Sequence, residues 1–246
     1  METMLQPLAG KAVLVTGGAR RIGRAIALCL AEAGAHVAVT YRNSSADAQK
    51  TIENIEALGR HGLAICCDLR QEDSVRQAVG EAAAALGGID ILVNNAAIFA
   101  SSPFDALSLE AWDAVFETNA RGPFLVSREA LPWLRVARGR IVNIGSIGGQ
   151  RPWATHAHYC SAKAALDMLT RSMAKALAPE ITVNGVAPGW IEAEGADPVQ
   201  AAHFAAKTPM QRNGRPEEVA EAVLFFAAGP KFVTGQILSV DGGLGL

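Results

Sequence analysis

Tyr159 and Lys163 are the side chains of this sequence best suited to exchanging a proton with a bound molecule. They lie four residues apart in a helical pattern over residues 157–178, so both project from one face of that helix. A free tyrosine has a pKa of about 10, too high for acid–base work near neutral pH, and a neighbouring ammonium lowers it by favouring the phenolate. Ser146 lies thirteen residues before the tyrosine, just after an apolar run that ends at residue 144. These residue types together indicate a proton-transfer centre.

A glycine-rich turn over residues 16–23 joins the first apolar run to the first helical pattern. It reads Thr-Gly-Gly-Ala-Arg-Arg-Ile-Gly, with Gly17 and Gly23 near its two ends. Glycine permits a tight turn and lets the backbone approach a pyrophosphate, while the following helix presents free N–H groups and the positive end of its dipole. We interpret the turn as a dinucleotide site; the alternative is a tight turn that binds nothing.

The residues after the second apolar run distinguish between the two nicotinamide dinucleotides. A carboxylate at this position holds the ribose 2′-hydroxyl of NAD(H), whereas an arginine suits the 2′-phosphate of NADP(H). The chain has Arg42 and Ser44 here and no acid before Asp47, and Arg20 of the glycine turn is placed to assist. We therefore predict NADP(H) in preference to NAD(H). The alternative is a solvated turn that only caps the next helix.

Asn119 is a polar residue within the apolar stripe of its helical pattern, where Val115 and Phe116 share its face. Pro123, four residues further on, has no N–H, so the main-chain carbonyl of Asn119 loses its helical donor. A kink that captures a water is the expected repair. The pattern indicates either a water-holding asparagine or a purely structural kink.

Short apolar runs alternate with helical patterns along the whole chain. Such runs are typical of strands buried on both faces, and the alternation predicts a parallel sheet wrapped by helices. We expect an α/β protein with a single-domain Rossmann fold over residues 1–246, a doubly wound parallel sheet of about seven strands with helices on both faces. Residues 190–214 break the rhythm, and we predict that this long irregular insertion is a substrate lid. The expected strands cover 12–16, 37–41, 63–67, 89–93, 140–144, 182–187 and 237–240, and the expected helices cover 22–33, 45–59, 71–86, 109–135, 157–178 and 215–228.

Composition argues against several classes of partner. The net charge is −2 with no basic stripe, so nucleic acid and acidic membrane surfaces are poor partners. No stretch approaches the length of a membrane span, and the N-terminal residues 1–11 do not read as a signal peptide. The four cysteines lack the spacing of zinc or redox motifs. We therefore expect no metal and a cytoplasmic protein with free thiols.

Several segments together resemble the short-chain dehydrogenase/reductase family. The glycine turn resembles the family's Thr-Gly-x-x-x-Gly-x-Gly fingerprint, with Arg21 in place of the middle glycine. Residues 94–97 resemble the family's Asn-Asn-Ala-Gly, with Ala97 in place of the glycine. Residues 142–146 and 159–163 closely resemble its active-site segment. Further matches at 233–236 and 240–243 extend the resemblance over nearly the whole chain, although Ala193 stands where the family often has a threonine that holds the carboxamide.

The resemblance implies a role for each matching position. Tyr159 would exchange the proton with the substrate oxygen, and Ser146 would hydrogen-bond that oxygen. Lys163 would lower the tyrosine pKa and bind the nicotinamide ribose, while Asn119 would hold a water linking the lysine to solvent. The implied cofactor contacts are Gly17, Arg20, Arg21, Ile22, Gly23, Tyr41, Arg42, Asn43, Ser44, Asp68, Leu69, Asn95, Ala96, Ala97, Tyr159, Lys163, Pro188, Gly189 and Ile191.

Two of these assignments have alternatives or overlapping roles. Asp68 would meet the adenine amino group, but it could instead serve as the N-cap of the third helix. Asn95 belongs to a buried pair that steadies the central strand in the family, so its structural and cofactor roles overlap. Family members of this size commonly form tetramers, so we expect a homotetramer or homodimer that pairs helices 109–135 and 157–178.

The resemblance implies an NADP(H)-dependent oxidoreductase that transfers a hydride between nicotinamide and a carbonyl or alcohol substrate. The substrate could be a 3-oxoacyl thioester or another ketone, in a pocket formed by Phe99, Ser146, Trp153, Tyr159 and Trp190. Pteridine reduction is the first alternative, because those enzymes share the residue types at Arg21 and Phe99 but carry an aspartate at the position of Ser146. A non-catalytic NADP-binding sensor is the second. For each aromatic residue, core packing remains the simpler role.

Overall fold

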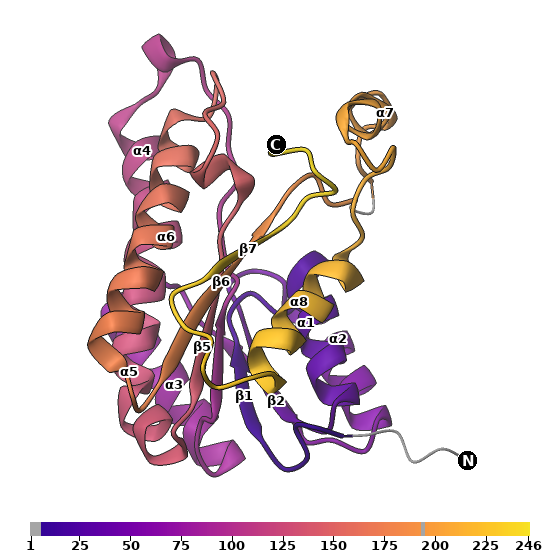
Figure 1. Ribbon diagram of the computed structural model, residues 1–246. Coiled ribbons are helices and arrows are strands. Elements are labelled where there is room, and N and C mark those ends of the chain that lie inside the picture. Colours follow the sequence, from indigo (N-terminus) through magenta and orange to yellow (C-terminus); the bar gives the residue numbers. More distant parts are fainter. Residues whose placement is uncertain (1–5, 193–194) are drawn as a thin grey trace.

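Seven parallel strands form one sheet in a computed structural model that describes residues 6–192 and 195–246 (Figure 1). The strand order is β3-β2-β1-β4-β5-β6-β7, so the chain changes direction across the sheet between β1 and β4. The carboxyl ends of all strands lie at one edge, where ligands bind in sheets of this kind. The strands are β1 (Ala12–Val15), β2 (His36–Tyr41), β3 (Gly62–Cys66), β4 (Ile91–Asn94), β5 (Arg140–Ile144), β6 (Thr182–Pro188) and β7 (Ile237–Val240).

Helices cover both faces of the sheet (Figure 1). One face carries α1, α2 and α8, and the other carries α3, α5 and α6, with α4 beside α6. The helices are α1 (Arg21–Glu32), α2 (Ser45–Ala57), α3 (Glu72–Leu86), α4 (Leu109–Phe116), α5 (Gly122–Ala137), α6 (Ala157–Leu177), α7 (Pro198–Lys207) and α8 (Pro216–Ala228). The predicted fold, with seven strands and helices on both faces, is confirmed.

The core consists of two apolar layers, one on each side of the sheet. Val13 and Val15 of β1 pack into the layer that contains α1, α2 and α8, whereas Leu14 between them packs into the opposite layer. Successive strand side chains point to opposite faces. Both faces are covered here, so apolar residues dominate the strands, as the sequence indicated.

The helix predicted over 109–135 is wrong in one respect, because a π-helical turn divides it. This turn, Glu117–Arg121, separates α4 from α5, and the N–H of Gly122 donates to the carbonyl of Glu117, five residues back. Pro123 follows at once and has no N–H to continue an ordinary α-helical ladder. The wider turn is how the chain accommodates the break foreseen at Asn119.

The segment 190–214 is also more regular than expected, because it contains α7. The Asp197 side chain caps this helix by accepting from the N–H of Val199 at 2.9 Å, and Pro198 occupies its first position. Figure 1 shows α7 beyond the carboxyl edge of the sheet. Ala193 lies outside the described residues, as do the first five residues of the N-terminal segment. Within the described residues, no helix has both the length and the apolar character to cross a membrane.

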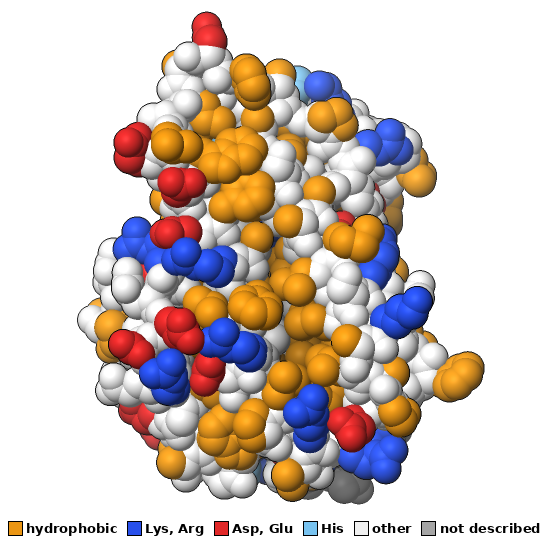
Figure 2. Space-filling model, turned by 90° about the vertical axis from the view of Figure 1, so that its left-hand side faces the viewer, with side chains coloured by type: hydrophobic (Ala, Val, Ile, Leu, Met, Phe, Trp, Pro, Cys, Tyr) orange, Lys and Arg blue, Asp and Glu red, His pale blue; other side chains and the backbone are white. Residues whose placement is uncertain are grey.

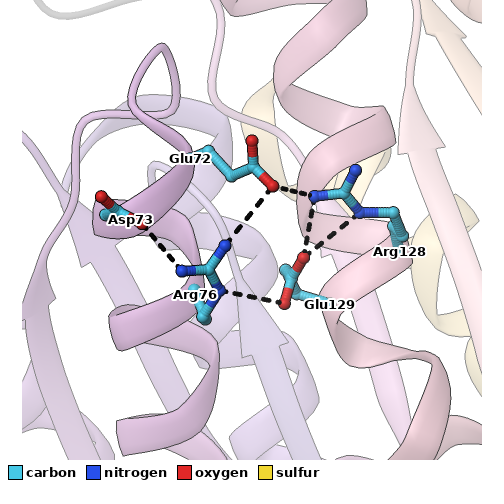
Figure 3. A network of polar contacts seen from close by, with 5 residues as sticks. All are labelled: Glu72, Asp73, Arg76, Arg128 and Glu129. Atoms are coloured by element: carbon cyan, nitrogen blue, oxygen red, sulfur yellow. Dashed lines mark hydrogen bonds and ion pairs between the residues drawn. The ribbon is translucent and has the colours of Figure 1, made fainter.

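The outer face of α4, α5 and α6 carries many apolar side chains (Figure 2). Leu109, Phe124 and Met168 are among those that remain exposed there. The same side of the molecule also carries a surface network of charges, formed by Glu72, Asp73, Arg76, Arg128 and Glu129 of α3 and α5 (Figure 3). We call these five residues the α3–α5 network.

Candidate active site

The glycine turn after β1 is shaped by steric necessity at its two ends. Gly17 has φ +65°, and a Cβ there would lie 2.9 Å from the Cα of Ala96. A Cβ on Gly23 would lie 2.1 Å from the carbonyl oxygen of Gly17. Arg21, at the middle position where the family has glycine, also adopts a left-handed conformation with φ +51°. The turn therefore keeps a conformation that favours glycine at the cost of backbone strain at Arg21.

The turn is fixed to the end of β4 by hydrogen bonds. The Asn95 side-chain amide donates to the carbonyls of Thr16 at 2.9 Å and Gly17 at 3.0 Å. In return, the Thr16 hydroxyl accepts from the main-chain N–H groups of Asn95 and Ala96 at 3.0 and 3.1 Å. Asn95 is thus a brace for the turn as well as a lining residue. Thr16 is a bracing residue that the sequence analysis did not single out.

A cleft of about 450 Å³ opens in front of this turn. It brings together residues from the ends of β1, β2, β3 and β4, as expected for the carboxyl edge of the sheet. Most of the predicted cofactor contacts line it: Gly17, Arg20, Arg21, Ile22, Gly23, Tyr41, Arg42, Asn43, Ser44, Asp68, Leu69, Asn95, Ala96 and Ala97.

At one end of the cleft, Arg42 and Ser44 have groups free to meet a ligand. Arg42 is exposed and forms no ion pair within the described residues. Ser44 occupies the N-cap position of α2, but its side chain makes no capping hydrogen bond. Arg20 lies 3.6 Å from Asp47, so it is partly neutralised. Ser44 therefore caps α2 through its main-chain carbonyl, which accepts from the N–H of Ala48 at 2.9 Å, and not through its hydroxyl.

Asp68 is held by a neighbouring arginine. The Arg70 guanidinium donates to both carboxylate oxygens, and its Nε lies 2.9 Å from Oδ1. This pairing lowers the pKa of Asp68 to about 2, so the carboxylate is charged at neutral pH. Asp68 does not cap α3, because the N-cap of that helix is Gln71. The predicted contact with adenine remains a prediction.

The carboxyl end of β5 is the place where Ser146, Tyr159 and Lys163 come together. The Ser146 hydroxyl accepts from the N–H of Gly148 at 3.0 Å, which leaves its own proton free to donate. Lys163 is only 2% exposed, and its Nζ donates to the Ile144 carbonyl at 2.7 Å. The same nitrogen lies 5.8 Å from the centre of the Tyr159 ring. The structure thus places a hydroxyl donor, a phenol and a buried cation next to one another.

Burial controls the protonation of this group. Desolvation raises the pKa of Tyr159, and its hydrogen-bonding contact with Ser146 opposes that shift. Desolvation lowers the pKa of Lys163 to about 8, while the charge of Asp167 acts to raise it. Burial also raises the pKa of Asp167, one helical turn beyond the lysine. Sequence reasoning missed Asp167, although its spacing of four from Lys163 and eight from Tyr159 was a usable signal.

The Asn119 side chain pairs with the backbone of Ile98 in the loop after β4. It is fully buried, and its amide oxygen accepts from the N–H of Ile98 at 2.8 Å. Its amide nitrogen donates to the carbonyl of the same residue at 2.9 Å. Asn119 therefore fixes the backbone immediately before Phe99. The water assigned to its main-chain carbonyl remains a prediction.

Three aromatic rings gather beside the phenol of Tyr159. The Phe99 ring centre lies 5.0 Å from that of Tyr159, and the Trp153 ring stacks on Tyr159 at 6.0 Å. His156 stacks on Phe99 at 4.9 Å. Trp190 does not join this group and instead stacks on Phe204 of α7 at 4.2 Å. The structure thus unites three of the predicted pocket residues with His156, while Trp190 belongs to a second aromatic pair.

The last predicted cofactor contacts lie at the end of β6, outside the lining of the cleft. Pro188 is the final residue of that strand, and the N–H of Gly189 donates to the carbonyl of Val240 at 3.0 Å. Ile191 forms an isolated bridge with Gly214. Their contact with a nicotinamide remains a prediction.

The fold and the glycine turn define a Rossmann-type domain, and comparison with known proteins gives its family. The profile of a family described as enoyl-(acyl carrier protein) reductase matches residues 17–245. The 3-oxoacyl-[acyl-carrier-protein] reductase FabG of Staphylococcus aureus is 37% identical over 240 residues, covering 95% of this chain and 98% of the relative.

Solved structures agree with this assignment. A short-chain dehydrogenase from Burkholderia cenocepacia, in complex with NADP, is 41% identical with a TM-score of 0.92 over 98% of this chain and 100% of that one. A short-chain dehydrogenase/reductase from Serratia marcescens is 38% identical with a TM-score of 0.93 over 98% of this chain and 100% of that one. The chain belongs to the short-chain dehydrogenase/reductase family and is an oxidoreductase.

Proposed function

We propose that this protein is an NADP(H)-dependent oxidoreductase that interconverts a carbonyl compound and its alcohol. The observation that carries the proposal is the grouping of Ser146, Tyr159 and Lys163 at the edge of the sheet that also holds the glycine turn and its cleft. Both 3-oxoacyl thioesters and other ketones carry the carbonyl that such a group would act on. The curated relative from Staphylococcus aureus is named for reduction of a 3-oxoacyl carrier protein.

The residues of the cleft suit a dinucleotide with a 2′-phosphate. Gly17 and Gly23 have no room for a Cβ, so only glycine lets the turn close as a pyrophosphate cradle. The Arg42 guanidinium forms no ion pair in the described part of the chain, and the Ser44 hydroxyl makes no capping hydrogen bond to α2. Arginine binds phosphate oxygens through its planar fork. These residues would hold NADP(H), and the Burkholderia cenocepacia relative is described in complex with NADP.

Bound NADPH would supply a hydride to the carbonyl carbon, and the chain's own residues would manage the proton. Tyr159 would donate its phenolic proton to the carbonyl oxygen. Ser146 would donate a second hydrogen bond to the same oxygen, because its hydroxyl accepts from Gly148 and its proton is not used in that contact. Lys163 would stabilise the phenolate formed at Tyr159. We also propose that the main-chain carbonyl of Asn119 holds a water on the solvent side of the lysine, and that residues 190–214 serve as the lid.

Cofactor binding tests the proposal directly. We expect fluorescence titration to give clearly tighter binding of NADPH than of NADH. Arg42→Ala should weaken NADPH binding by about tenfold or more, the usual effect of losing a charged hydrogen bond, and leave NADH binding unchanged. Arg135→Ala is the control, since Arg135 is exposed and pairs with Glu180 away from the cleft. Equal binding of the two cofactors by the wild type would contradict the assignment of NADP(H).

Pterin reduction is a second candidate, favoured by the exposed ring of Phe99 beside Tyr159. Related pteridine reductases carry an aspartate where this chain has Ser146. Ser146→Asp should therefore improve pterin turnover if this candidate is correct. Absence of biopterin reduction by both the wild type and the variant would eliminate it.

We further propose that the chain assembles as a homotetramer or homodimer through the outer face of α4, α5 and α6 (Figure 2). Leu109, Phe124 and Met168 on that face are exposed apolar side chains that a second copy would cover. Size-exclusion chromatography with light scattering should give a multiple of the 25.7 kDa chain mass. A single species at the monomer mass would contradict this assembly.

A further inference from the structure

Phe99 is a large apolar side chain left exposed beside the proposed catalytic phenol. Its ring is 61% exposed, whereas Tyr159 is 8% exposed. The two ring centres lie 5.0 Å apart at 89°, an edge-to-face contact. Phe99 also lines the cleft that would hold the cofactor. One face of the ring is therefore available to a molecule that reaches both the cofactor and Tyr159.

The loop that carries Phe99 is fixed on both sides of the ring. Ile98 is held through its N–H and its carbonyl by the Asn119 side chain. Four residues further on, the N–H of Ser102 donates to the carbonyl of Thr155 at 2.8 Å. An aromatic surface that is already positioned costs little further ordering when a ligand binds. The ring thus has the properties of a preformed contact surface.

The neighbouring rings extend this surface toward Ser146. His156 stacks on Phe99 at 4.9 Å, and Trp153 stacks on Tyr159 with an interplanar angle of 11°. The indole lies against the turn after Ser146, because a Cβ on Gly148 would lie 3.1 Å from it. Burial and the nearby His158 lower the pKa of His156, so its ring is neutral at neutral pH. Phe99, Trp153, His156 and Tyr159 form what we call the aromatic wall.

We propose that the aromatic wall selects carbonyl substrates that carry an aromatic ring next to the C=O group, with aryl alkyl ketones as the substrate class. This inference rests on the proposed carbonyl reduction and names its substrate. The substrate ring would pack on Phe99, and its carbonyl oxygen would face Tyr159 and Ser146. Bound NADPH would supply the hydride to the carbonyl carbon and leave as NADP⁺. The π electron pair of the C=O bond would move to oxygen, which would take the Tyr159 proton to give a secondary alcohol.

A matched pair of ketones tests the selectivity. Phenyl methyl ketone and cyclohexyl methyl ketone have rings of similar size, but only the first ring is flat and aromatic. We would measure kcat/KM for both with NADPH in wild type, Phe99→Leu and the control Phe104→Leu, whose phenylalanine is 76% exposed and outside the wall. Phe99→Leu keeps apolar volume but removes the ring. It should lower the phenyl-to-cyclohexyl ratio by about two- to tenfold, the effect of losing an aromatic pair, and Phe104→Leu should leave the ratio unchanged.

The outcomes separate this inference from the function on which it rests. If Phe99→Leu lowers kcat/KM equally for both ketones, or for neither, the aromatic selection is overturned while carbonyl reduction stands. The same holds if the wild type reduces the N-acetylcysteamine thioester of 3-oxobutyrate but no aryl ketone. Reduction of biopterin and of no carbonyl compound would overturn both the inference and the proposed function. If NADPH binds and no carbonyl compound is reduced, the proposed function fails and the inference fails with it.

Discussion

Two groups of charged residues in this molecule show how burial changes what a charge can do. In the α3–α5 network (Figure 3), Arg76 and Glu72 are 58% and 51% exposed in their side chains. On α6, Lys163 and Asp167 are 2% and 4% exposed. Solvent screens the first group, so each pair contributes little to stability. In the second group desolvation moves the pKa of each residue toward neutral pH, as the value of about 8 for Lys163 shows. Only the second group is suited to proton chemistry.

The largest effect should come from removing the proton donor next to the buried group. We expect Tyr159→Phe to lower kcat by about 10²- to 10⁴-fold, the usual contribution of general acid catalysis. NADPH affinity should stay within about twofold, because the variant loses only a hydroxyl and keeps the buried ring. The measurement is steady-state NADPH oxidation with a ketone, together with fluorescence titration of the cofactor. Ser161→Ala removes an exposed hydroxyl from the same helix and should change neither value. Full activity in Tyr159→Phe would rule out Tyr159 as the proton donor. A signalling function that survives the substitution would favour the non-catalytic NADP-binding sensor.

Lys163 should make stability depend on pH in a way that no residue of the α3–α5 network does. Its pKa in the folded chain is about 8, below the ordinary lysine value, so between these values the unfolded chain binds more protons. The free energy of unfolding of the wild type should therefore rise with pH above about 8 relative to Lys163→Met, by at most about 1.4 kcal/mol per pH unit. Urea unfolding from pH 7 to 10 measures this difference. Lys175→Met, on the exposed end of the same helix, should run parallel to the wild type; a parallel curve for Lys163→Met would contradict the lowered pKa.

Asp167 partly offsets the effect of desolvation on the pKa of Lys163, so its removal tests how charge and burial share control of that pKa. Burial raises the pKa of Asp167, whereas Arg171 and Lys163 on α6 and a hydrogen-bonding contact with Gln150 act to lower it and so favour the charged carboxylate. We expect Asp167→Asn to lower the pKa of Lys163 below its wild-type value, since a favourable negative charge is lost. NMR titration of ¹³Cε-labelled lysine, assigned through Lys163→Met, measures this directly. Glu180→Gln removes an exposed acid and should not move the signal. An unchanged Lys163 titration in Asp167→Asn would show that burial alone sets its pKa.

The fold was predictable because the strands are largely apolar and each main helix buries one face. The helix α7 was missed because it is short, lies in a segment rich in alanine, proline and polar residues, and buries none of its residues. The break at the π turn was expected from Pro123, but the pairing of the Asn119 side chain with Ile98, 21 residues away, was not, because no local pattern encodes it. Local periodicity therefore indicates elements that pack, but not those fixed by capping or by single distant contacts.

The site shows the same division. The approach of Ser146 to Tyr159 and Lys163 followed from the shared carboxyl edge of the sheet and the spacing of four on one helix. The net shift in the Tyr159 pKa did not follow, because burial determines it and burial is a property of the folded chain. The pairing of Asp68 with Arg70 was likewise hidden, since an aspartate after a strand has several possible partners. Residue type predicted the chemistry, and packing decided the charge states.

Arg21 has a strained backbone, and a substitution can test whether its guanidinium binds the cofactor or is only a surface charge. Its φ of +51° costs about 1 kcal/mol for a residue with a Cβ, so Arg21→Gly should raise the free energy of unfolding by up to that amount. If the guanidinium binds the cofactor, the same variant should bind NADPH more weakly. Arg138→Gly is the matched control, because Arg138 has φ +48° at the end of α5, away from the cleft. Both variants should be stabilised in urea, but only Arg21→Gly should lose NADPH affinity. Unchanged affinity would place Arg21 with the surface charges.

The smallest effect should come from the α3–α5 network itself. Glu72 accepts from both Arg76 and Arg128, so Glu72→Gln weakens two contacts at once. Each pair is exposed, and we expect a loss of less than about 1 kcal/mol in the free energy of unfolding, reduced further at high salt. Glu53→Gln on α2 is the control, because Glu53 is exposed and forms no ion pair in the described part of the chain. Urea unfolding at low and high salt, with NADPH oxidation in parallel, makes the measurement. Activity should not change; a loss of activity in Glu72→Gln would mean that the surface charges act on the site through α5, and the distinction between the two groups would no longer hold.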